Sequence, residues 1–300
     1  MMRVLVALAV VLTAAAAVQG SQATFSATAQ NAGSTFATAS DYIAPTVTLT
    51  TPAAGAATNS TTPTLSGAAG SATGDLTTVT VKIYSGSSAT GTPVQTKTPT
   101  ASGGTWSTTA STLAAGTYTA QATQTDTAGN TGTSTANTFT VDTTKPTATS
   151  VVAANKTGGT AGKIENGDTV TFGYSEAIDP TSVWAGWNGA STTVKVSFTN
   201  SASNDSFTIL DSSSGTTVHL GSVATSGNYV SGATTFNSTM VLSADRKSVV
   251  VTLGTPTNVQ SNAVAAKNMT WTVGSGIKDV AGNTITTPAS WSETDNDVDF

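Results

Sequence analysis

Apolar residues alternate with threonine and serine in short runs along most of the chain. Val79, Val81 and Ile83 occupy every second position of one such run, and a second run of this kind extends over residues 117–126. Alternation over four to eight residues is typical of β-strands that bury one face. Clusters of Gly, Pro, Asn and Ser separate the runs, as turns require. The pattern therefore predicts an all-β protein.

The spacing of the runs also predicts a domain organisation. Between residues 43 and 142 the runs have the number and spacing of strands in an immunoglobulin-like β-sandwich. We expect a linker at 143–146 and a second sandwich at 147–300. Residues 182–240 contain more strands than a minimal sandwich needs, so we expect an inserted β region there. The predicted fold is two tandem immunoglobulin-like β-sandwiches, the second one enlarged.

Residues 1–23 have the organisation of a secretory signal peptide. Arg3 precedes the apolar run Val4–Val18, and Ser21 and Ala23 place small residues before a cleavage position. The apolar run is shorter than the ~20 residues of a membrane-spanning helix. We therefore expect a secreted protein with no transmembrane segment in the mature chain.

The first predicted sandwich resembles the bacterial Ig-like repeats of large surface adhesins. The resemblance runs from Thr48 through the segment DTAGNT at 126–131 to the segment VDTTKP at 141–146. In addition, LAAGTY at 113–118 resembles the tyrosine corner of that superfamily, in which the Tyr118 hydroxyl bonds back to the preceding turn. The resemblance implies a spacer or adhesive surface module that is associated with the cell envelope.

The remaining segments resemble two other groups of bacterial surface proteins. Residues 167–180 (GDTVTFGYSEAIDP) are similar to a strand and turn of another Ig-like type, found in surface-layer and cell-wall proteins. Residues 242–253 and 277–284 resemble its hairpin and last turn. Residues 24–42, an N-terminal strand or linker, resemble the segment that follows the signal peptide in camelysin-like biofilm-matrix proteins. This implies an alternative function, a self-assembling matrix or filament subunit that adds this strand to a neighbour's sheet.

Composition excludes several classes of function. The chain of 300 residues has 9% charged residues, a formal net charge of −5 and no cysteine. Eleven basic residues spread over this length provide no basic patch for a nucleic acid. The absence of cysteine excludes disulfides and cysteine-ligated metals.

The sequence assigns no catalytic residue. The single histidine, His219, alternates with Val218 and Leu220 and is expected on the solvent face of a strand, without a nucleophile motif. Glu176 near Asp179 is the sharpest carboxylate pair, but its context predicts a strand end and a turn. We therefore expect a protein that is not an enzyme and requires no cofactor.

The repeated motif D-x-A-G-N at 126–130 and 279–283 leaves two interpretations open. In the first, the aspartate accepts hydrogen bonds within its own turn, and the glycine supplies a positive φ. In the second, turn and linker carboxylates bind Ca²⁺, which prefers oxygen ligands. The resemblance to adhesin repeats favours linker aspartates for this role. The candidate ligands are Asp126, Asp142, Asp168 and Asp179.

Trp184 and Trp187 lie three residues apart at the start of the expected insertion. They form either part of the core or a flat aromatic platform for a sugar ring. The sequence thus predicts a non-catalytic cell-surface or extracellular-matrix protein. Its expected partners are surface or matrix proteins, a polysaccharide or further copies of itself.

Overall fold

The computed structural model describes residues 42–258, 262–286, 290–293 and 300. The predictions of a signal peptide at 1–23 and of a self-assembling strand starting at residue 24 fall outside the described residues, apart from Tyr42. Within the described ranges the regular structure is almost entirely β, which confirms the all-β prediction. None of the helical structure in these ranges has the length and hydrophobicity of a membrane span.

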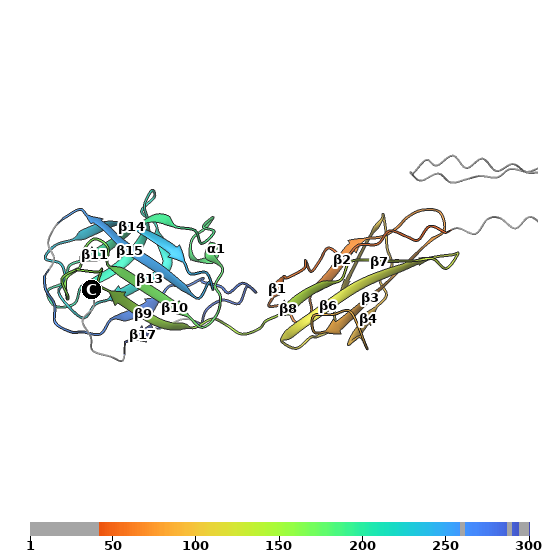
Figure 1. Ribbon diagram of the computed structural model, residues 1–300, viewed down its shortest axis with the longest axis horizontal. Helices are drawn as coiled ribbons and strands as arrows, with labels where there is room; N and C mark the ends of the chain where they lie inside the picture. The colour runs from red at the N-terminus through yellow and green to blue at the C-terminus, as the bar shows by residue number, and fades with distance from the viewer. Residues whose placement is uncertain (1–41, 259–261, 287–289, 294–299) are drawn as a thin grey trace, which may run out of the picture. The chain divides into compact units, whose positions relative to one another are not determined.

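The first eight strands form two sheets (Figure 1). The larger sheet has the order β1-β8-β6-β3-β4, with β7 paired to β6, and the smaller one pairs β2 with β5. All pairs are antiparallel except β1 with β8. The strands are β1 Ala57–Thr58, β2 Thr64–Ala68, β3 Asp75–Ser85, β4 Gln95–Lys97, β5 Thr105–Thr109, β6 Gly116–Asp126, β7 Thr131–Thr133 and β8 Asn137–Val141.

The alternating apolar residues of both sheets meet in one core. Val79, Val81 and Ile83 of β3 are fully buried, and they share this core with Leu65 of β2 and Trp106 of β5. A core enclosed between two sheets is the defining feature of a β-sandwich. Residues 42–142 therefore form a β-sandwich, which we call the N-terminal sandwich.

The rest of the described chain forms a single nine-stranded sheet, which we call the C-terminal sheet (Figure 1). Its order is β17-β16-β13-β12-β11-β14-β15-β10-β9, and every pair is antiparallel. The elements are β9 Ala148–Ala154, β10 Thr169–Tyr174, α1 Pro180–Val183, β11 Thr192–Thr199, β12 Ser206–Asp211, β13 Thr217–Ala224, β14 Thr234–Leu242, β15 Ser248–Pro256, β16 Thr270–Val273 and β17 Ser290–Ser292.

The C-terminal sheet differs from the prediction of a sandwich with a separate insertion. Additional strands do form in the region of 182–240, as β11 to β14. However, β14 pairs with both β11 and β15, so these strands continue the same sheet. The outermost strands β9 and β17 lie against each other, and the sheet encloses one core around the fully buried Trp271.

A single helical turn, α1, follows β10 where the sequence indicated only a turn. Asp179 caps it, because its side chain accepts a hydrogen bond from the Thr181 N–H. Pro180 at the first helical position has no N–H that would need a partner there. The turn ends at Trp184, so it places this side chain at the surface of the C-terminal sheet.

Candidate functional site

Both D-x-A-G-N motifs form the self-capped turn that was one of the two interpretations. In the first, Asp126 accepts hydrogen bonds from the backbone N–H and the side-chain Nδ2 of Asn130. These bonds, the Nδ2 bond foremost, hold the pKa of Asp126 below its usual value. Gly129 has φ +93°, which a residue with a Cβ rarely adopts.

The second turn repeats this geometry and adds contacts to the N-terminal sandwich. Asp279 accepts bonds from the N–H groups of Ala281 and Asn283 and from Asn283 Nδ2. Asn283 Nδ2 also donates to the carbonyl of Asp142, 2.9 Å away. The Ala281 carbonyl accepts from the N–H of Asn59, at 3.0 Å.

Asp279 also belongs to a group of three carboxylates. Oxygen atoms of Asp142, Glu176 and Asp279 all lie within 4.8 Å of one another. Glu176 Oε2 is buried and has no hydrogen-bond partner. Burial, followed by the charges of Asp142 and Asp279, raises the pKa of Glu176, and Lys247 opposes this effect. We call this group the junction cluster.

The junction cluster contains one of the four aspartates named from the sequence, Asp142. Asp126 caps its own turn, and Asp179 caps α1 through Thr181. Among the residues that the structure describes, these two and Asp168 are not part of a carboxylate group that fits a metal ion.

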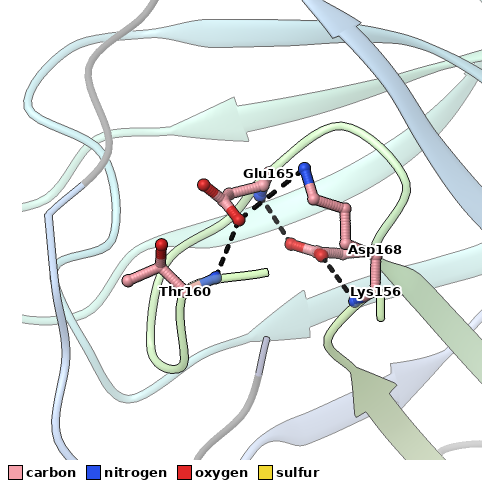
Figure 2. A network of polar contacts seen from close by, with 4 residues as sticks. All are labelled: Lys156, Thr160, Glu165 and Asp168. Carbon is pink, nitrogen blue, oxygen red and sulfur yellow. Dashed lines mark hydrogen bonds and ion pairs between the residues drawn. The ribbon is translucent and has the colours of Figure 1, made fainter. Parts of the chain in front are cut away.

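Asp168 has a different local role, which Figure 2 shows. Its carboxylate accepts hydrogen bonds from the N–H groups of Lys156 and Glu165 and closes the loop between β9 and β10. Glu165 in turn accepts from the Thr160 N–H and pairs with Lys156 Nζ at 3.7 Å. Burial raises the pKa of Asp168, whereas the Thr160 bond lowers the pKa of Glu165. The network stabilises the loop.

Glu176 and Asp279 are the members of the junction cluster that were not among the candidate calcium ligands named from the sequence. The sequence does contain a signal for each, because Asp279 begins the second D-x-A-G-N motif and Glu176 follows the end of β10. Their proximity depends on an isolated bridge between Ile178 and Asp279, about one hundred residues apart in sequence. Periodicity within either segment carries no information on that contact.

The two tryptophans separate into different environments. Trp187 is 5% exposed and its Nε1 donates to the carbonyl of Ala190, as expected for a core residue. Trp184 is half-buried against the same core and lines a surface hollow. Only Trp184 therefore offers a ring face to a ligand.

His219 is exposed on β13 between the buried Val218 and Leu220, as the alternation predicted. Its Nδ1 lies 2.9 Å from the carbonyl of Ser182 in α1, so in this contact the imidazole N–H is the donor. The histidine therefore fastens α1 to the C-terminal sheet.

The N-terminal sandwich has the architecture of the immunoglobulin-like class of fold. Two sheets enclose one core, and the Tyr118 hydroxyl donates to the carbonyl of Ala114 at 3.1 Å, which is the tyrosine corner of that class. The family model described as "Bacterial Ig-like domain" matches residues 50–143. This part of the chain is a bacterial Ig-like domain.

One solved structure similar to this chain is described as Escherichia coli alpha-2-macroglobulin activated by porcine elastase. The similarity covers 80% of this chain and 23% of that one, at 12% sequence identity and a TM-score of 0.26. The chain thus spans less than a quarter of that protein's length. No curated protein matches the chain.

Proposed function

We propose that this protein is an exported, non-catalytic surface module in which the bacterial Ig-like domain and the C-terminal sheet act together as a spacer. The observation that carries the proposal is the pair of hydrogen bonds made by the Asp279–Asn283 turn. One joins Ala281 to Asn59, and the other joins Asn283 to Asp142. A spacer needs such a junction, since a bare flexible linker leaves neighbouring domains free to move.

The connection between the two parts supports the same interpretation. Before the linker, the Asp142 N–H donates to the Thr58 carbonyl. After it, Thr147 exchanges hydrogen bonds with Ser175, through its N–H to Ser175 Oγ and its carbonyl from the Ser175 N–H. Only residues 143–146 lie between these anchored positions. Such a short linker restricts the relative motion of the parts that it joins.

The junction cluster suits a divalent cation of the calcium type. Its donors are carboxylate oxygens, the ligands that Ca²⁺ prefers, and Glu176 Oε2 is a buried acceptor without a hydrogen bond. Three carboxylates at this separation repel one another, and a bound cation would remove that repulsion. We therefore propose that Asp142, Glu176 and Asp279 bind calcium and that the ion stiffens the junction.

A thermal unfolding experiment tests the calcium proposal. In chelator at pH 7, Glu176→Gln should unfold at a higher temperature than the wild type. This direction follows from the raised pKa of Glu176. The stability that a carboxyl group with a raised pKa contributes is present below its unfolded pKa of about 4.3 and is lost as the pH rises through the folded pKa. At pH 7 the ionised Glu176 therefore destabilises the folded protein, and glutamine removes that charge. Calcium at 100 times its Kd should stabilise the wild type by ~2.7 kcal/mol, roughly 5 °C in Tm, and leave Glu176→Gln unchanged.

Asp211→Asn is the matched control, because Asp211 ends β12 and accepts bonds from Ser213 and Ser214 in the turn that follows. This variant should keep the full response to calcium. The proposal fails if millimolar calcium leaves the wild-type Tm unchanged, or if Glu176→Gln responds as the wild type does.

As a surface module, the protein would present its loops to a surface or matrix protein or to a polysaccharide of the cell envelope. No catalytic step is part of this function.

A further inference from the structure

A surface hollow of about 400 Å³ lies beside the loop that follows α1. This volume is in the range of small-ligand pockets in proteins, which are typically lined by aromatic groups and a few polar ones. The residues that line it include Trp184, Gly186, Trp187, Asn188, Ser191 and Thr192.

The loop around the hollow is held in one conformation by its own hydrogen bonds. Trp184 accepts from the Trp187 N–H through its carbonyl, and Trp187 Nε1 donates to the Ala190 carbonyl at 2.7 Å. The Ala190 N–H donates to Asn188 Oδ1. The buried Trp187 ring anchors this loop to the core. A site formed in advance costs less conformational entropy when a ligand binds.

The lining combines an aromatic face with neutral hydrogen-bonding groups. Trp184 is half-buried, and its Nε1 has no hydrogen bond to any described residue. The same holds for the hydroxyls of Ser191 and Thr192 and for Asn188 Nδ2, and none of the lining residues is charged. A charged ligand would thus lose hydration without gaining a countercharge. We propose that this hollow binds a neutral saccharide, with a sugar ring stacked on Trp184 and its hydroxyls bonded to Asn188, Ser191 and Thr192.

A second hollow, of about 620 Å³, provides a contrast in the N-terminal sandwich. It is also lined by threonine and serine, but its tryptophan, Trp106, is 3% exposed. Trp106 Nε1 already donates to the carbonyls of Thr48 and Ala68. This hollow therefore has hydroxyls without an accessible aromatic face, and the saccharide site is assigned to Trp184.

Calorimetric titration of the whole protein tests the proposal with three defined probes. These are the β-1,4-linked hexamers of glucose and of N-acetylglucosamine, and an anionic hexamer of galacturonate. We expect at least one neutral hexamer to bind and the anionic hexamer not to bind. The two neutral probes distinguish a plain glucan from an acetamido glycan as the source of the ligand.

Two variants locate the site. Trp184→Leu keeps an apolar side chain against the core but removes the flat ring, and Ser191→Glu adds charge and bulk at an exposed rim position. Each should weaken binding at least tenfold. Trp291→Leu, at another half-buried tryptophan on β17, should leave the affinity unchanged. Circular dichroism confirms that each variant is folded.

The proposal is overturned if neither neutral hexamer binds the wild type at millimolar concentration or if the galacturonate hexamer binds as well as they do. Binding that survives both Trp184→Leu and Ser191→Glu would also contradict it. Calcium does not contribute to this site, so failure here leaves the junction proposal untouched, and the reverse also holds.

Discussion

Asp211 illustrates at the residue scale how this chain uses its few charged side chains. Its carboxylate accepts hydrogen bonds from the hydroxyls and N–H groups of Ser213 and Ser214 in the turn between β12 and β13. These bonds, led by that from the Ser214 hydroxyl, lower its pKa to about 2. Asp126 and Asp245 likewise accept bonds within their own turns, and their pKa values are also lowered. Ionised carboxylates therefore stabilise the turns of an otherwise weakly charged protein.

Acid unfolding of Asp211→Asn tests this role. Because the folded pKa lies below the unfolded one, Asp211 contributes stability above pH ~4 that is lost as pH falls toward 2. The variant should be less stable than the wild type at pH 7, and the difference should shrink between pH 4 and pH 2. Stability is measured by urea denaturation at each pH.

Ser214→Ala is the control for Asp211→Asn, because it keeps the carboxylate but removes the hydroxyl donor. It should show an intermediate loss at pH 7. A difference between wild type and Asp211→Asn that stays constant from pH 7 to pH 2 would rule out a role for the ionised carboxylate.

At the scale of elements, alternation predicted most of the strands, because each strand buries one face. Val79, Val81 and Ile83 are fully buried in β3, and the strands expected within 182–240 form as β11 to β14. Alternation does not determine which strands become neighbours. Pairing of β14 with both β11 and β15 places the expected insertion within one continuous sheet, and this depends on contacts between distant segments.

The candidate site was less predictable than the strands, for a related reason. Both D-x-A-G-N turns could be recognised, since their bonds are local to each motif. The junction cluster combines Asp142, Glu176 and Asp279 from three separate segments. Trp184 and Trp187 differ in exposure, and both follow α1, a helical turn that the sequence indicated only as a turn at Asp179–Pro180.

The tyrosine corner gives a prediction at the element scale. Tyr118→Phe removes the hydroxyl that donates to Ala114 and so releases the start of β6 from the preceding turn. A hydrogen bond of this kind contributes about 1 kcal/mol. We expect that loss in the free energy of unfolding, measured by urea denaturation with an unchanged m-value.

Tyr84→Phe is its control. Tyr84 is also in the N-terminal sandwich and is 8% exposed, but its hydroxyl has no hydrogen bond to any described residue. The expected change is within ~0.5 kcal/mol. Equal losses in the two variants would mean that the Tyr118 hydroxyl has no special part in the sandwich.

At the scale of the whole molecule, the proposed spacer function depends on the junction between the N-terminal sandwich and the C-terminal sheet. The Asp279–Asn283 turn contacts Asn59 and Asp142 through hydrogen bonds, and the junction cluster lies beside it. The proposed spacer function requires that these contacts hold the two parts in one arrangement. The saccharide site proposed at Trp184 would then be displayed by a stiff module.

The most direct test is a distance distribution measured by electron spin resonance between two spin labels. The chain has no cysteine, so Thr96→Cys in β4 and Thr239→Cys in β14, both exposed, provide unique labelling positions. We predict one narrow distribution with calcium, a broader one in chelator, and a broad one with calcium when Asn283→Ala is added. Asn130→Ala, the matching change in the first D-x-A-G-N turn, should leave the distribution narrow. A distribution that is equally broad with calcium, in chelator and in Asn283→Ala would contradict the spacer function.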